Sequence, residues 1–324
     1  MRLIREPQLK TFIKSLQERS FTNGKKGGIQ NIVREIINDV RRNGDKAVKK
    51  YTEKYDSIKL RRLSIDRKEI ESSAKKANRE LLSAIKLSAK RIRAFHELQK
   101  EESWYFSEDN ILLGQIIKPI ERVGVYVPGG KASYPSTVLM NVIPAQVAGV
   151  KEIALCVPTA GGKINPSVAA AIKLLGLKEV YRVGGAQAIA AMAYGTKMIK
   201  KVDKIVGPGN VYVAAAKKMV FGDVGIDMIA GPSEVLIIAD ASANPSFIAA
   251  DLLSQAEHDE MASAVLITNS EPLAKKVNQE ISTQLKNLKR RDIAKKSLDK
   301  YGAIIIIKDL NTAVDIANNI APEH

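Results

Sequence analysis

From about residue 110 onward, short apolar runs alternate with alanine-rich stretches, and these runs stop at glycine or proline. The first runs lie at 123–127, 153–157, 179–183 and 204–206, and the alanine-rich stretches at 136–148, 166–175, 186–194 and 211–219. Apolar runs of this length that end in turn residues predict buried strands, and the stretches between them are long enough for helices. Strands that alternate with helices of this size indicate parallel βαβ units.

A second alternating set follows, and the first hundred residues differ from both. Strands are expected at 235–240, 264–268 and 303–307, and helices at 245–257, 271–287 and 310–319. Residues 1 to about 105 instead repeat apolar residues near a helical period. This period predicts a helix over 29–55, interrupted at 42–45, and a second helix over 67–99.

These patterns predict an α/β fold with two Rossmann-like parallel-sheet modules and an N-terminal helical segment. We expect an N-terminal arm at residues 1–18, a first module formed by 19–108 plus 234–324, and a second module formed by 109–233. The length of 324 residues also suits two hydrophobic cores rather than one.

Composition limits the kinds of partner and the cellular compartment. No apolar run approaches the roughly 20 residues of a membrane span, and the charged start lacks a signal-peptide core. The single cysteine excludes an intramolecular disulfide framework, so we expect a cytoplasmic protein. The net charge of +16 would suit nucleic acid, but the basic residues are dispersed and few aromatic residues accompany them. We therefore expect neither a membrane nor a nucleic acid as partner.

Four glycine-containing turns are expected at the carboxyl ends of parallel strands, where open α/β sheets bind their ligands. They lie at 126–130, 184–187, 207–210 and 231–234. Glycine permits close backbone approach, and the helix that follows offers free N–H groups to a phosphate. The turns predict an anion or nucleotide site of unspecified mode, because none matches the G-x-G-x-x-G fingerprint. Ordinary strand-to-helix turns are the alternative.

Two polar pairs and one cysteine are the other candidates for chemistry. Gln255 and His258 lie three residues apart on an expected helix, so they would share a face and could hold zinc or form a mere polar stripe. Glu323 and His324 are adjacent and could be an acid/base pair or a chance juxtaposition. Cys156 lies in an apolar strand and is expected to be a small buried hydrophobe rather than a nucleophile.

Blocks of sequence along nearly the whole chain resemble those of histidinol dehydrogenases. The blocks are 40–47, 51–56, 126–130, 184–190, 206–210, 230–234, 254–259 and 321–324. Their order along the chain is far more specific than any one motif. The resemblance implies an enzyme that depends on zinc and NAD and oxidises L-histidinol to L-histidine. The oxidation would proceed in two hydride transfers, through an aldehyde held in the site.

The resemblance also implies roles for individual residues. The implied contacts are Tyr126, Gln187 and Asn210 for NAD; Ser233, Gln255, His258 and His324 for substrate; Gln255 and His258 for zinc; and Glu323 and His324 for acid/base catalysis. The second module would then contact NAD.

Histidinol dehydrogenases continue beyond the Pro-Glu-His element, and that later part supplies further zinc ligands. One of those ligands comes from the partner chain of an intertwined homodimer. The resemblance therefore implies a homodimer, and it implies that a chain ending at His324 has an incomplete zinc shell and turns over poorly. A catalytically inactive binding protein that retains the fold is the alternative.

Overall fold

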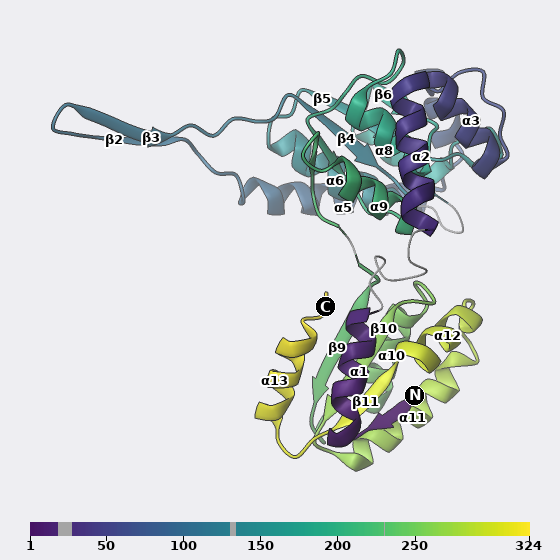
Figure 1. The fold of residues 1–324 in the computed structure, drawn as a ribbon, viewed down its shortest axis with the longest axis vertical. Helices are drawn as coiled ribbons and strands as arrows, with labels where there is room; N and C mark the ends of the chain where they lie inside the picture. The colour runs from purple at the N-terminus through teal and green to yellow at the C-terminus, as the bar shows by residue number, and fades with distance from the viewer. Residues whose placement is uncertain (19–27, 130–133, 230) are drawn as a thin grey trace. The chain divides into compact units, whose positions relative to one another are not determined.

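The computed structural model of the chain describes residues 1–18, 28–129, 134–229 and 231–324. The chain forms two compact units (Figure 1). The terminal unit contains residues 1–26 and 230–324, and the central unit contains residues 27–229. Each unit has a parallel sheet covered by helices, which confirms the predicted α/β class.

The central unit is built on a five-stranded parallel sheet in the order β6-β5-β4-β7-β8. The strands are β4 (Arg122–Tyr126), β5 (Glu152–Cys156), β6 (Glu179–Tyr181), β7 (Lys204–Val206) and β8 (Gly225–Ile226). The helices between them are α6 (Pro135–Val147), α7 (Pro166–Leu174), α8 (Gly185–Tyr194) and α9 (Val211–Val220). The first four of these strands and all four helices match the predicted segments to within a few residues.

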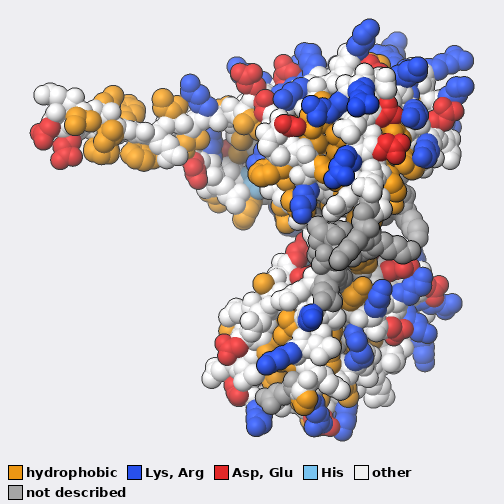
Figure 2. All heavy atoms as spheres, in the orientation of Figure 1, with side chains coloured by type: hydrophobic (Ala, Val, Ile, Leu, Met, Phe, Trp, Pro, Cys, Tyr) orange, Lys and Arg blue, Asp and Glu red, His pale blue; other side chains and the backbone are white. Residues whose placement is uncertain are grey.

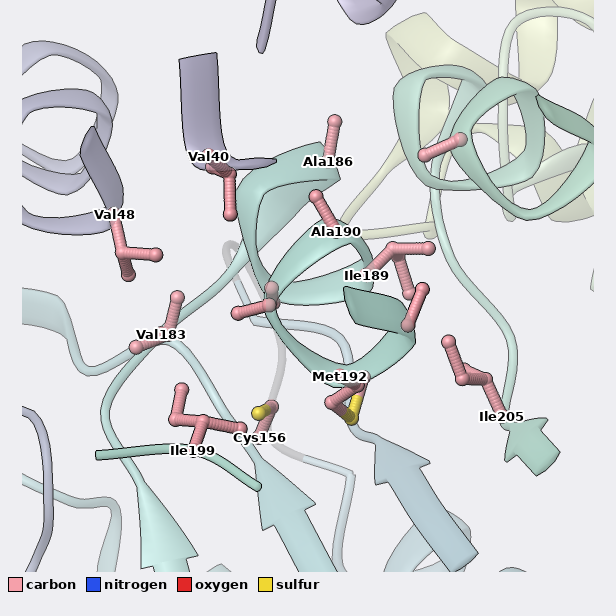
Figure 3. Close-up of a cluster of buried hydrophobic side chains, with 14 of the residues drawn as sticks. Val40, Val48, Cys156, Val183, Ala186, Ile189, Ala190, Met192, Ile199 and Ile205 are labelled. Atoms are coloured by element: carbon pink, nitrogen blue, oxygen red, sulfur yellow. The ribbon is translucent and has the colours of Figure 1, made fainter. Parts of the chain in front are cut away.

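Helix α8 is buried on all sides, and its composition explains why. Its alanines are small enough for close approach to neighbouring elements, and eight of its residues are buried. In Figure 3, Val40 and Val48 approach α8 on one side, while Cys156 and Ile205 belong to the sheet on the other. The helix therefore forms a middle layer between the sheet and the N-terminal helices.

The N-terminal helices belong to the central unit, so the predicted domain division is wrong for residues 28–108. The helices are α2 (Gly28–Asn43), α3 (Asp45–Asp56), α4 (Arg67–Ala74) and α5 (Arg79–Glu97). Helix α2 packs on α8 and α9, α4 packs on α7, and α5 packs on α6. The apolar stripe of α2 shares one core with Ile189 and Met192, which attaches these helices to the central sheet.

A hairpin follows α5, and the sequence did not predict it. Strands β2 (Trp104–Glu108) and β3 (Ile111–Gln115) are antiparallel, and Asp109 and Asn110 in the turn have φ of 44° and 68°. Two successive left-handed residues of this kind are typical of a type I′ turn. All ten strand residues are exposed, and the hairpin extends away from the rest of its unit (Figures 1 and 2).

The terminal unit has a four-stranded parallel sheet in the order β1-β11-β10-β9. Its strands are β1 (Arg2–Ile4), β9 (Glu234–Ala239), β10 (Ser263–Thr268) and β11 (Ala303–Ile306). Its helices are α1 (Glu6–Glu18), α10 (Pro245–Ala256), α11 (Glu271–Leu285), α12 (Arg291–Tyr301) and α13 (Leu310–Ile320). The sequence did not predict α12.

The first 18 residues are not a separate arm. Arg2 pairs with Ala303, and Ile4 and Phe12 enter the core that contains Ile267. Three residues are too short for a periodic signal, so only the open edge of β11 makes β1 a strand. None of the helices in the described residues is long and apolar enough to cross a membrane.

Candidate functional site

The central unit contains a pocket of about 370 Å³ at the carboxyl edge of its sheet. Its lining includes residues that follow β4, β5, β6 and β7, and residues of α2 and α3. The lining residues are Ile32, Ile36, Tyr55, Asp56, Tyr126, Gly129, Pro158, Gly184, Gly185, Ala186, Gln187, Asn210 and Tyr212. The three residues implied to contact NAD therefore lie around one pocket.

Tyr126 presents a neutral hydroxyl to this pocket. The residue is the last of β4 and is buried, and burial raises its pKa to about 12. The backbone N–H of Gly185 donates a hydrogen bond to its Oη over 3.1 Å. Because the oxygen accepts from the protein, the hydroxyl proton is available to donate to a ligand.

The N-terminus of α8 supplies N–H groups to the same pocket. Gly184 is the N-cap residue and provides no side-chain cap, and Gly185 has φ of +65°. This conformation favours glycine, and a Cβ at Gly185 would also require the Gln187 amide, 2.7 Å away, to move. An uncapped N-terminus of this kind attracts an anion through its free N–H groups and the helix dipole.

Asn210 has two functions at the pocket wall. It is the N-cap residue of α9, and its Oδ1 accepts hydrogen bonds from the N–H groups of Tyr212 and Val213, each over 3.1 Å. Since the cap uses the oxygen, the amide hydrogens on Nδ2 remain to face a ligand.

An ion pair between buried Lys217 and the more exposed Asp227 holds the turn that carries Asn210. Asp227 accepts the N–H of Gly207 over 2.8 Å and pairs with Lys217, whose Nζ also donates to the Gly207 carbonyl over 3.1 Å. Gly207 has φ of +114°, and a Cβ there would collide with the carbonyl oxygen of Tyr126 at 2.1 Å. These contacts fix the turn against β4 and so fix the position of Asn210.

The last of the four predicted turns lies elsewhere. Residues 231–233 precede β9, so they are at the amino end of the terminal sheet rather than at a carboxyl end. The Ser233 carbonyl accepts a hydrogen bond from the N–H of Ser263 at the start of β10, over 3.0 Å. Two residues of the predicted motifs, Gly130 and Ala230, lie outside the described residues.

Gln255 and His258 do not share a helix, which corrects the sequence prediction. Helix α10 ends at Ala256, and His258 lies exposed in the turn that follows. The N–H of His258 still donates to the Gln255 carbonyl over 3.1 Å, so the chain makes one more tight turn and the three-residue spacing is kept. Among the described residues, no group of three His, Cys, Asp or Glu side chains could hold a metal ion.

Glu323 and His324 follow α13 in extended conformation beside β9. The N–H of Leu236 donates to the His324 carbonyl over 2.9 Å, and the N–H of His324 donates to the Glu234 carbonyl over 3.2 Å. This pattern is that of a parallel strand neighbour. The backbone is therefore fixed at the edge of the sheet, while both side chains are exposed.

The five implied substrate, metal and acid/base residues thus belong to one edge of the terminal sheet. Helices α10 and α13 each run back from the carboxyl edge to the amino edge, as the helices of βαβ units must. Their ends carry Gln255, His258, Glu323 and His324 to the edge where Ser233 enters β9.

Two other residues lie outside both sites, and one group of pocket residues was not predicted. Cys156 is fully buried and burial raises its pKa to about 12, which confirms that it is a buried hydrophobe. His96 is half-buried and contacts Gln99. Tyr55 and Asp56 line the pocket although no role was assigned to them, because their helix was expected in the other module.

Comparison with known proteins places the chain among one group of enzymes. A family model described as histidinol dehydrogenase matches residues 19–324. The chain is 52% identical over 300 residues to histidinol dehydrogenase of Syntrophotalea carbinolica, covering 92% of this chain and 70% of that protein. It is 54% identical over 294 residues to that of Aquifex aeolicus, covering 90% of this chain and 68% of the relative.

A solved structure is similar along the whole chain. The crystal structure of histidinol dehydrogenase from Elizabethkingia anophelis superposes with a TM-score of 0.92 at 39% identity. The match covers 100% of this chain and 75% of that one. The chain therefore spans roughly two thirds to three quarters of the length of these relatives.

Proposed function

We propose a function from the premise that the chain belongs to the histidinol dehydrogenase family, whose model matches residues 19–324. The chain is an NAD-dependent oxidoreductase of histidine biosynthesis that converts L-histidinol to L-histidine through the aldehyde. The observation that carries this proposal is the sequence identity to relatives named histidinol dehydrogenase. It is 52% and 54% over 92% and 90% of the chain. The same observation favours an enzyme over an inactive binding protein with the same fold.

The pocket of the central unit is the proposed NAD site. The free N–H groups at the start of α8 suit the pyrophosphate. The Tyr126 hydroxyl and the Asn210 amide hydrogens each have a donor left for the cofactor. Gln187 is 2% exposed and lines the pocket, so its side-chain amide faces the same space from within the first turn of α8.

Glu323 and His324 are the proposed acid/base residues of the terminal unit. In each oxidation a hydride leaves carbon for the nicotinamide while a hydroxyl proton leaves for a base. Imidazole suits this base because its ordinary pKa lies near neutral pH. Between the oxidations the aldehyde adds water, and in this proposal the Glu323 carboxylate accepts a proton from that water. Cys156 is too deeply buried to be the nucleophile instead.

Gln255 and His258 are the proposed metal donors. A carboxamide oxygen and an imidazole nitrogen from one turn suit zinc, which when bound would orient the substrate's nitrogen atoms. The described residues contribute this pair without a third ligand, and catalytic zinc sites usually have three protein ligands.

Histidinol-dependent NADH formation tests the proposed activity. We expect two NADH per histidinol consumed, and we expect His324→Ala to slow turnover by about 100-fold or more because the base is lost. The control is His96→Ala, which removes an imidazole outside both sites. If the chain binds NAD but forms no NADH from histidinol even when zinc and the C-terminal part of a histidinol dehydrogenase are added in trans, the inactive alternative is correct.

NAD binding and metal content test the other assignments separately. We expect Gln187→Ala to weaken NAD binding by about 10-fold, the value of one hydrogen bond in a buried site. We expect His258→Ala to lower the zinc retained after dialysis, and His96→Ala to leave it unchanged. Equal zinc retention by the two variants would contradict the proposed donors.

A homodimer is also proposed, and the hairpin supports it. An isolated two-stranded hairpin is only marginally stable in water. Both strands of this hairpin also expose large apolar side chains, whose burial against a partner would stabilise it. Among them are Trp104, Tyr105, Phe106, Ile111, Leu112 and Leu113. Exposed apolar patches of this kind mark interfaces, and we expect a second copy of the chain to cover this one.

Light scattering tests this assembly. We expect twice the chain mass for the wild type, and a shift toward monomer for the double variant Tyr105→Ser, Leu112→Ser. The matched control is Leu98→Ser, an exposed leucine outside the hairpin strands. A wild-type monomer at all concentrations would contradict the homodimer.

A further inference from the structure

Asp56 lies at an unfavourable position in the wall of the pocket. It is the last residue of α3, and Ser57 after it ends the helix in left-handed conformation with φ of 55°. The C-terminal end of a helix carries partial negative charge, which destabilises a carboxylate there. Asp56 nevertheless lines the pocket, beside Tyr55.

No group in the described residues compensates the charge of Asp56. No described N–H or O–H group donates a hydrogen bond to its carboxylate, and no described Lys or Arg forms an ion pair with it. Burial raises its pKa, with no opposing contribution from a cation. The helix end, the burial and the missing partner each destabilise the folded chain, so a folding role does not explain this residue.

Its neighbourhood indicates what the carboxylate faces. Burial is the main cause of the raised pKa of Tyr126, and the negative charge of Asp56 raises it further, so the two side chains are close. The pocket therefore has an acceptor-only group near Tyr126, whereas the start of α8 contributes N–H donors. A phosphate suits the α8 end, and a ligand group that can donate hydrogen bonds suits Asp56.

We propose that the Asp56 carboxylate accepts hydrogen bonds from the ribose hydroxyls next to the adenine, and that it makes the site selective for NAD over NADP. The vicinal hydroxyls of that ribose match an acceptor-only side chain, and acidic residues bind them in dinucleotide folds. NADP carries a phosphate on this ribose, which would be repelled by the unpaired carboxylate. This inference rests on the proposed NAD pocket and extends it to cofactor selection.

Calorimetric titration of the full chain with NAD and with NADP tests the proposal. Asp56→Asn keeps the shape of the side chain and removes its charge. We expect this variant to bind NAD about 10-fold more weakly and to bring the ratio of NADP to NAD dissociation constants down by about 10-fold or more. The matched control is Glu53→Gln, which removes one charge from the exposed face of the same helix and should change neither constant.

Folding does not confound this test, because removing a carboxylate from a helix C-terminus does not destabilise the helix. Equal weakening of both cofactors at an unchanged ratio would assign Asp56 a merely structural role and overturn the proposal. An unchanged affinity for both cofactors would overturn it as well. If the wild type bound neither cofactor, the proposed pocket itself would be wrong, which is a different result.

Discussion

The two units share one architecture, but their proposed functional residues lie at opposite edges of their sheets. In the central unit the pocket lies at the carboxyl edge, where the strands deliver Tyr126 and Gly184. In the terminal unit Ser233 and His324 lie at the amino edge, beside the start of β9. The carboxyl-edge rule for open α/β sheets therefore finds the cofactor residues and misses the others.

The units also differ in how charge is used. In the central unit Arg122, at the start of β4, donates to Glu152 at the start of the neighbouring β5 and to Glu179 at the start of β6, the next strand along. This guanidinium is buried and joins three strands at the edge opposite to the pocket. The ion pairs of the terminal unit's described residues, such as Lys296–Glu260, are on the surface. The comparison indicates that charge stabilises the central unit more.

The largest loss of stability is expected from a substitution at Gly207, beneath the pocket. Gly207→Ala would place a Cβ 2.1 Å from the Tyr126 carbonyl oxygen at φ of +114°. We expect a loss of about 4 kcal/mol in the free energy of unfolding, from backbone strain and overpacking together. Thiol labelling of Cys156 in denaturant measures this loss, because the only cysteine is buried in the central unit.

Gly231→Ala is the matched change in the terminal unit. A Cβ at Gly231 meets no atom within 4 Å, so we expect its effect to stay below about 0.5 kcal/mol. Equal losses at the two glycines would show that close approach beneath the pocket does not distinguish the units.

The next effect is expected at the buried guanidinium. Arg122→Met keeps most of the aliphatic volume and leaves Glu152 and Glu179 without their partner. We expect a loss of about 2 kcal/mol, because the hydrogen bonds from the buried guanidinium are lost while the partly exposed carboxylates remain solvated. Lys296→Ala in the terminal unit should cost less than about 0.5 kcal/mol, the usual value of an exposed pair. Similar losses of stability in Arg122→Met and Lys296→Ala would contradict the conclusion that charge stabilises the central unit more.

The smallest change in stability is expected from lowering the pH. The hydrogen bond from Arg122 lowers the pKa of Glu179 below its ordinary value. As pH falls through that ordinary value, the unfolded chain takes up the proton first, so the stability that this carboxylate contributes is lost on acidification. Denaturation followed by circular dichroism from neutral pH to about pH 3 should show a decline that is weaker in Arg122→Met. An identical decline in both proteins would contradict this assignment.

Strands and helices that repeat a local pattern could be predicted, and elements that depend on distant contacts could not. The runs at 123–127 and 264–268 became β4 and β10 because their apolar content matches burial on both faces. Strand β1 has three residues, and it forms only because β11 offers a free edge. The hairpin of β2 and β3 is exposed on all sides, so burial left no alternating pattern to detect.

The candidate site shows the same limit. The family resemblance implied that Tyr126, Gln187 and Asn210 contact NAD, and the tertiary structure placed all three around one pocket. The resemblance assigned no role to Asp56, although the block at 51–56 contains it, because an acid at a helix end usually indicates an ordinary solvated residue. The prediction of a shared helix for Gln255 and His258 was wrong by two residues, since helix ends depend on the following loop.

The sequence by itself determined the α/β class, the βα alternation of both units and the family. These properties depend on periodicity and local turn residues, which each segment carries without its neighbours. Only the tertiary structure decided that α2 and α3 join the central sheet and complete its pocket, and that two returning helices carry the proposed acid/base and metal residues to an amino edge. An apolar stripe specifies that a helix is buried, but the partner that buries it is selected by the shapes of surfaces far apart in the chain.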